Sequence, residues 1–102
     1  MTKFEVLTPL GFTVRTTESY WKLLLFKHPE ISGRDRDVSE TLSEPNLVCR
    51  SCHDPTVYLF YRAEGDYYLC VVAKCLNGEG FIVTAYVTET IKEGEELWPT
   101  SA

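Results

Sequence analysis

Residues 67–75, YYLCVVAKC, decide the fold because they have the pattern of a strand that is buried on both faces. Successive side chains of a strand point to opposite faces of the sheet, so a strand with one wet face alternates apolar and polar residues. Here Lys74 is the only charged residue, and both sets of alternate positions are otherwise apolar or aromatic. We therefore expect 67–75 to be a central strand of the sheet.

Three further stretches are rich in β-branched and aromatic residues: 47–51, 56–62 and 80–87. Short segments with turn-forming residues separate the four stretches, at 54–55 (DP), 64–66 (EGD) and 77–80 (NGEG). Connections this short join antiparallel neighbours, because a parallel pair needs a long crossover. The sequence therefore predicts a four-stranded antiparallel meander.

The N-terminal part predicts a hairpin followed by a helix. Residues 4–7 and 12–15 are the expected hairpin strands, joined by a turn at 8–11 (TPLG) with the Pro and Gly that such turns favour. A helix is expected over 19–27, with Thr17 or Ser19 as its N-cap. Its apolar face recurs at helical spacing, at Trp21, Leu24, Leu25 and His28.

A second, shorter helix is expected over 34–43, with Val38 and Leu42 as its apolar positions. The predicted fold class is therefore α+β, with an N-terminal hairpin and two short helices packed on one face of a four-stranded antiparallel meander sheet. The 102 residues have the size of one domain, 1–102. We expect its helical part at about 17–44, its sheet at about 47–87 and an acidic C-terminal segment at 88–102.

The net charge of −5 argues against a protein whose whole surface binds nucleic acid, although a local basic cleft can still bind phosphate. Segment 15–36 is mildly basic, and acidic residues crowd the C-terminal end at Glu89, Glu93, Glu95 and Glu96. No run approaches the roughly 20 apolar residues of a membrane helix. The N-terminus also lacks the apolar core of a signal peptide. We expect a cytoplasmic protein with reduced cysteines and no membrane partner.

Residues 49–53, CRSCH, match the C-x-x-C-H pattern of c-type haem attachment. We reject haem because Cys49 lies in a predicted strand, where residues three positions apart point to opposite faces. Cys70 and Cys75 are five positions apart in another strand, so the same alternation argues against a zinc site with two tight knuckles. We expect no metal and no cofactor, with Cys49, Cys70 and Cys75 packing as small apolar residues.

Three segments carry the candidate site: 27–34 (KHPEISGR), 44–51 (EPNLVCRS), and 71–74 (VVAK) with 80–86 (GFIVTAY). This layout resembles the phage-type branch of the barnase–EndoU–colicin–RelE-like (BECR) nuclease fold, whose small bacterial members carry a His-Pro near the first helix and a Val-x-Lys strand before a Thr-Ala-Tyr strand. The resemblance covers about 21–86. It implies a ribonuclease of toxin–antitoxin or phage origin, with RNA and a cognate antitoxin protein as partners. The positions that match the family's site are His28, Lys74, Thr84 and Tyr86.

Metal-free RNA cleavage needs side chains of these types. The 2′-hydroxyl is an internal nucleophile, so the site needs a base for its proton, an acid for the leaving oxygen and a cation for the charged phosphorane. An imidazole suits either proton transfer, so His28 fits the base or the acid, and Lys74 fits the cation. Thr84 and Tyr86 are two positions apart, share a strand face, and fit contacts to phosphate or base. The candidate substrate-binding cations are Arg50, Arg34 and Lys27.

Each candidate also fits a structural role. His28 can cap a helix C-terminus, Lys74 can reach solvent from a strand end, and Tyr86 can be a half-buried sheet residue. The same fold would also serve as a non-catalytic protein-binding module that docks through its sheet face or acidic tail. The aromatic stretch 57–61 fits either the core or a homodimer contact. These alternatives stay open on the sequence alone.

Overall fold

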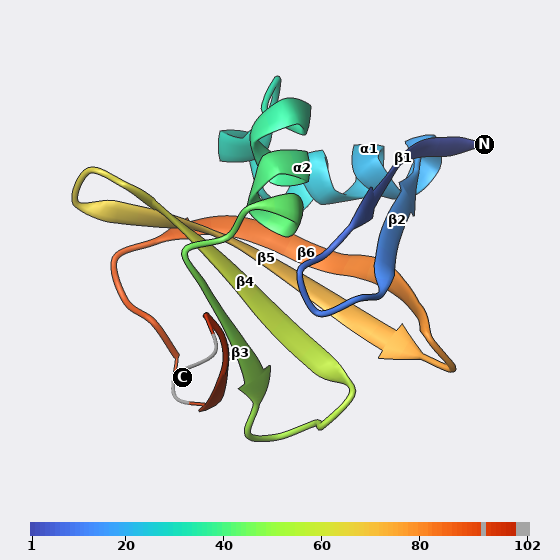
Figure 1. The fold of residues 1–102 in the computed structure, drawn as a ribbon. Coiled ribbons are helices and arrows are strands. Elements are labelled where there is room, and N and C mark those ends of the chain that lie inside the picture. Colours follow the sequence, from blue (N-terminus) through green and yellow to red (C-terminus); the bar gives the residue numbers. More distant parts are fainter. Residues whose placement is uncertain (93, 100–102) are drawn as a thin grey trace.

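The computed structural model describes residues 1–92 and 94–99, and within them it holds two α-helices, one 3₁₀ turn and seven strands (Figure 1). In chain order the elements are β1 (Thr2–Leu7), β2 (Thr13–Thr17), α1 (Glu18–Lys27), η1 (Pro29–Ile31), α2 (Asp35–Ser43), β3 (Leu47–Ser51), β4 (Val57–Glu64), β5 (Tyr67–Leu76), β6 (Glu79–Thr88) and β7 (Gly94–Trp98). The α+β class, the N-terminal hairpin and the two helices are confirmed.

The predicted meander is present as β3, β4, β5 and β6, with every consecutive pair antiparallel. Their bounds differ from the predicted ones by at most two residues at either end. The sheet order is β1-β2-β6-β5-β4-β3-β7, so β5 is the middle strand. Leu69, Cys70, Val71 and Ala73 on this strand are all fully buried, which confirms that its apolar run marks the centre of the sheet.

The sheet has seven strands rather than the four predicted, because strands join the meander at both edges. The hairpin is continuous with the sheet, since residues 13–15 of β2 pair in parallel with 79–81 of β6. At the other edge β7 pairs antiparallel with β3. β7 lies in the predicted acidic segment 88–102, of which residues 93 and 100–102 lie outside the described residues. An edge strand tolerates such charge because only its backbone needs a partner.

Both helices pack on the same face of the sheet, as predicted (Figure 1). The Thr17 side chain caps α1 by accepting a hydrogen bond from the Tyr20 backbone N–H at 3.2 Å. Trp21 of α1 and Val38 of α2 are buried in one cluster with Phe60 and Val71 of the sheet. Removing an apolar side chain of this size from water contributes roughly 1.5–3 kcal/mol, so this layer supplies much of the stability.

The opposite face carries no helix in the part of the chain that the structure describes. A second, smaller cluster lies there, made of Cys49, Leu59, Tyr61, Cys70 and Val72. We call this side, which no described helix covers, the open face, although the cluster itself is buried. No described helix is long and apolar enough to cross a membrane.

Candidate functional site

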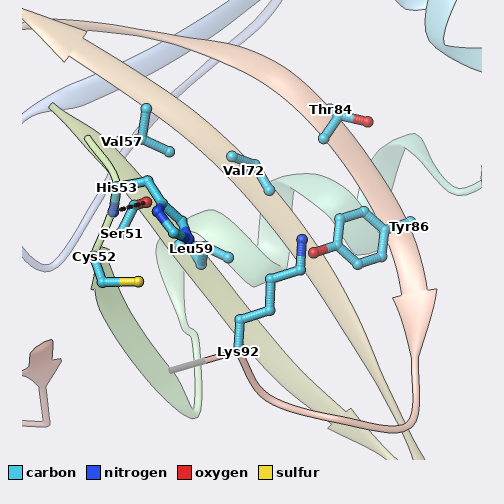
Figure 2. Close-up of a pocket in the computed structure, with 9 residues that line it drawn as sticks. All are labelled: Ser51, Cys52, His53, Val57, Leu59, Val72, Thr84, Tyr86 and Lys92. Carbon is cyan, nitrogen blue, oxygen red and sulfur yellow. Dashed lines mark hydrogen bonds between the residues drawn. The ribbon is translucent and has the colours of Figure 1, made fainter. Parts of the chain in front are cut away.

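A pocket of about 520 Å³ lies on the open face of the sheet (Figure 2). Three strands, β4, β5 and β6, form its floor, while the β3–β4 loop and the β6–β7 connection form its walls. The lining residues are Ser51, Cys52, His53, Val57, Leu59, Val72, Thr84, Tyr86 and Lys92. Two of the four predicted catalytic residues, Thr84 and Tyr86, are among them.

A β-bulge in β6 turns Thr84 and Tyr86 toward the pocket. Ile82 pairs with Ala73 and belongs to the helix-side core, whereas Thr84 pairs with Val72 on the open face. Residues two positions apart in a regular strand share a face, so Thr84 would point toward the helices without the irregularity at Val83. The prediction that Thr84 and Tyr86 share a face is confirmed, and the bulge determines which face it is.

Tyr86 holds a neutral hydroxyl beside the pocket. Burial, with a further contribution from the nearby Cys70 thiol, raises the pKa of the Tyr86 hydroxyl above its usual value. The group therefore stays protonated at neutral pH and acts as a hydrogen-bond donor rather than as a base. Its oxygen is buried beside the Cys70 thiol and makes no hydrogen bond to a nitrogen or oxygen of the described residues.

Lys92 supplies an ammonium group from the β6–β7 connection. Its Nζ lies 5.5 Å from the centre of the Tyr86 ring, within the range of a cation–π contact. The Lys92 backbone N–H donates a hydrogen bond of 3.1 Å to the hydroxyl of Tyr61, which is fully buried beneath the connection. The main chain that carries Lys92 is thus held to the sheet, while the side chain remains exposed.

His53 contributes an imidazole from the β3–β4 loop. Its backbone N–H donates to the Ser51 Oγ at 3.1 Å, which folds the loop back over the end of β3 (Figure 2). Asp54 tightens the next turn by accepting hydrogen bonds from the Thr56 N–H and hydroxyl, at 2.9 and 2.7 Å. These bonds are the main cause of the lowered pKa of the Asp54 carboxyl. The loop therefore holds His53 at the pocket wall.

His28 reaches the same region from the helix layer. It is the C-cap of α1, with its backbone N–H bonded to the Leu24 C=O at 2.7 Å, so the structural role weighed above is present. Its ring centre also lies 6.0 Å from that of Tyr86, and its Nδ1 lies 3.5 Å from the Glu30 carboxylate. His28 thus flanks Tyr86 without lining the pocket, and about a third of its side chain is exposed.

Lys74 lies at the loop end of the same face. It is two positions from Val72 on β5 and pairs with Val57, and both of these neighbours line the pocket. Its Nζ is 3.5 Å from the Asp54 carboxylate, which holds the ammonium beside the loop rather than over the floor. The structure therefore brings Lys74 to the edge of the pocket and leaves Lys92 as the ammonium that lines it.

The three predicted substrate-binding cations do not line the pocket. The Arg50 guanidinium stacks 5.5 Å from the Tyr58 ring, in a hollow on the far side that it shares with Leu10 and Phe12. Arg34 is paired with the carboxylates of Asp37 and Glu64. Lys27 is exposed in the last turn of α1.

Two lining residues, His53 and Lys92, are not among the residues that the sequence predicts for the site. His53 falls in the loop before Asp54 and Pro55, so the sequence favours His28 as the catalytic histidine, and Lys92 is one cation within an acidic segment. The sequence offers only their positions as a signal. His53 follows a predicted strand end, and Lys92 lies in the connection that leaves the strand carrying Thr84 and Tyr86. Neither signal fixes the direction of a loop side chain.

The cysteines differ by location. Cys49 and Cys70 are buried under the open face, while Cys52 is exposed in the loop and lines the pocket. Strand alternation does not govern Cys52, because β3 ends at Ser51. Among the described residues no group of three or more His, Cys, Asp or Glu side chains is placed to hold a metal ion.

No family model matches the chain, and it has no match among the curated proteins or the solved structures. The resemblance to the BECR nuclease fold therefore stays a prediction that rests on the motifs quoted above.

Proposed function

We propose that this chain is a small metal-independent ribonuclease, related to the phage-type BECR nucleases, that works in the open-face pocket. One observation carries the proposal: a single pocket combines an imidazole from His53, an ammonium from Lys92 and the hydroxyls of Thr84 and Tyr86. Proton transfer, charge stabilisation and hydrogen bonding to a phosphate are the three requirements of RNA cleavage through the 2′-hydroxyl.

In this reaction the 2′-oxygen attacks the adjacent phosphorus while the bond from phosphorus to the 5′-oxygen breaks. A base removes the 2′ proton and an acid protonates the departing 5′-oxygen, so the products are a 2′,3′-cyclic phosphate and a 5′-hydroxyl. His53 at the loop wall and His28 beside Tyr86, outside the lining residues, are the two imidazoles of the chain. We assign one proton transfer to each, since an imidazole can act as base or acid near neutrality.

The remaining polar groups face the phosphate. Lys92 is a compact charge that stabilises the non-bridging oxygens of the phosphorane. Thr84 and Tyr86, which both line the pocket, carry the hydroxyls available for hydrogen bonds to phosphate or base. The apolar floor of Val57, Leu59 and Val72 offers a dry surface for a nucleobase.

The test is cleavage of a mixed-sequence, end-labelled RNA by the purified protein in EDTA. We expect cleavage that falls about a hundredfold or more in His53→Ala, as for loss of a general acid or base. Lys92→Ala should also lose activity, whereas Lys22→Ala, an exposed lysine of the helix layer, is the matched control that should not. Circular dichroism checks that each variant is folded.

The product ends give a second, independent criterion. A 2′,3′-cyclic phosphate is required by attack of the 2′-hydroxyl, and a substrate with 2′-O-methyl groups should resist cleavage. Cleavage that survives both His53→Ala and Lys92→Ala belongs to a contaminant, and the absence of any cleavage contradicts the proposal.

A second candidate function, protein binding, is favoured by the outward side of α1. Phe26 is 89% exposed and Leu23 is 53% exposed, one helical turn apart, with Lys22 and Lys27 beside them. Apolar side chains this exposed on a small protein mark a contact surface. We propose that a protein partner, such as a cognate antitoxin, covers them. Light scattering tests the homodimer expected as an alternative: a dimer that dissociates in Phe26→Ser identifies a second copy of this chain as the partner.

A further inference from the structure

We infer that Tyr61 is a positioning residue, whose buried hydroxyl fixes the β6–β7 connection so that Lys92 lies in the pocket. The inference rests on the proposed function for the role of Lys92. It adds a residue that does not line the pocket and that the sequence marks only as the end of the aromatic stretch 57–61.

The contact is specific to the tyrosine hydroxyl. Tyr61 is fully buried in the middle of β4, where it packs with Leu59 and Cys70 under the open face. Its oxygen accepts the Lys92 N–H at 3.1 Å. Burial is the main cause that raises the pKa of the Tyr61 hydroxyl, so it remains neutral throughout the physiological range. A phenylalanine would keep the packing and lose the hydroxyl, which accepts from Lys92 and lies beside the Cys70 thiol.

The same connection is fixed at its far end. Gly94 pairs with Ser51, and a Cβ at Gly94 would overlap the Arg50 carbonyl oxygen, so β7 lies unusually close to β3. Glu95 adds an ion pair to Arg50 at 3.3 Å. Among the described residues 89–92, the hydrogen bond to Tyr61 is the backbone contact that ties Lys92 to the sheet.

The rate of cleavage depends on where the single ammonium group that stabilises the phosphorane lies. A misplacement of about 1 Å in a catalytic group can cost on the order of a hundredfold in rate. Lys92 is exposed and its side chain is long and flexible, so its preferred position depends on where the backbone is held. Releasing the backbone should lower the rate without removing the charge.

The test is a double-mutant cycle on RNA cleavage. We expect Tyr61→Phe to reduce kcat/KM about tenfold, and Tyr61→Phe with Lys92→Ala to be no slower than Lys92→Ala alone, because the hydroxyl acts through Lys92. Losses that simply add would overturn the inference, as would wild-type cleavage by Tyr61→Phe.

Thr41→Val is the matched control for stability. The Thr41 hydroxyl is also fully buried and donates to the Asp37 carbonyl at 2.7 Å, but it lies in α2 on the other side of the sheet. Both variants lose one buried hydrogen bond, worth about 1 kcal/mol. Only Tyr61→Phe should lose activity, so equal losses in the two would contradict a positioning role.

Amide hydrogen exchange measured by NMR separates this inference from the ribonuclease proposal. The Lys92 amide should be protected in the wild type and unprotected in Tyr61→Phe, with the Thr41→Val variant unchanged. An unprotected Lys92 amide in the wild type overturns the tether even if RNA is cleaved. If the wild type cleaves no RNA, the ribonuclease proposal fails, and the exchange measurement alone decides whether Tyr61 fixes the connection.

Discussion

At the residue scale, Cys52 and Cys70 carry the same thiol in opposite surroundings. Cys70 is fully buried, and burial raises the pKa of its thiol to about 11. Because the thiolate is the reactive form, roughly one Cys70 in a thousand is reactive at pH 8. Cys52 lies exposed at the pocket wall, where a reagent can reach it.

We therefore predict that iodoacetamide at pH 8 labels Cys52 first and leaves Cys70 unlabelled in the folded protein. Mass spectrometry of digested samples gives the site, and Cys52→Ser is the control that should lose the rapid label. Urea should expose Cys70 and make both thiols react. Rapid labelling of Cys70 in the native protein would mean that its thiol is more accessible to solvent than the structure shows.

The candidate site was predictable where strand periodicity governs the side chains. Thr84 and Tyr86 were expected on one face because they are two positions apart, and they do share the pocket. The bulge at Val83 that sets the face could not be predicted, since it depends on the pairing with β5. His53 and Lys92 lie in connections, where hydrogen bonds to Ser51 and Tyr61 decide the direction of the chain.

At the element scale, β7 and the pairing of β2 with β6 were the features that the sequence analysis did not predict. Residues 94–98 (GEELW) carry two glutamates, and strand propensity is weak there, so the ladder with β3 decides the structure. Gly80 offered a signal for β2. A Cβ added at Gly80 would lie 2.9 Å from the Thr13 carbonyl oxygen, and a glycine inside a strand often marks such a close backbone approach.

The close approach of β7 to β3 leads to a prediction for Gly94→Ala. The added methyl would collide with the Arg50 carbonyl, a rigid part of β3, so we expect a loss of about 1–3 kcal/mol in the free energy of unfolding. Urea denaturation followed by circular dichroism measures it. Glu96→Ala, exposed on the same strand, should change stability by less than about 0.5 kcal/mol. A Gly94→Ala variant as stable as the wild type would show that β7 has room beside β3.

At the scale of the whole molecule, the cations outside the pocket are largely paired with carboxylates. Lys3 contacts Asp35 at 2.8 Å and Glu18 at 3.6 Å, and Arg36 contacts Glu40 at 3.1 Å. The chain as a whole carries a net charge of −5. The net charge therefore does not favour long-range attraction of RNA, and we expect binding to depend on the few cations near the pocket.

This charge distribution predicts a shallow salt dependence of RNA binding. Each phosphate contact on a single strand contributes about −0.7 to the slope of log K against log salt. With Lys92 in the pocket and Lys74 at its edge, we expect a slope no steeper than roughly −1.5. Fluorescence anisotropy of a 2′-O-methyl oligonucleotide, titrated from low to moderate KCl, measures the slope without cleavage.

The variants locate the contacts that produce this slope. Lys92→Ala should make it shallower by about 0.7, while Lys22→Ala on the helix layer should leave it unchanged. A slope near −4 that Lys22→Ala reduces would mean that RNA also lies along α1. In that case the exposed lysines beside Phe26 belong to the substrate site, and the open-face pocket is only part of it, because two lysines at the pocket cannot neutralise so many phosphates.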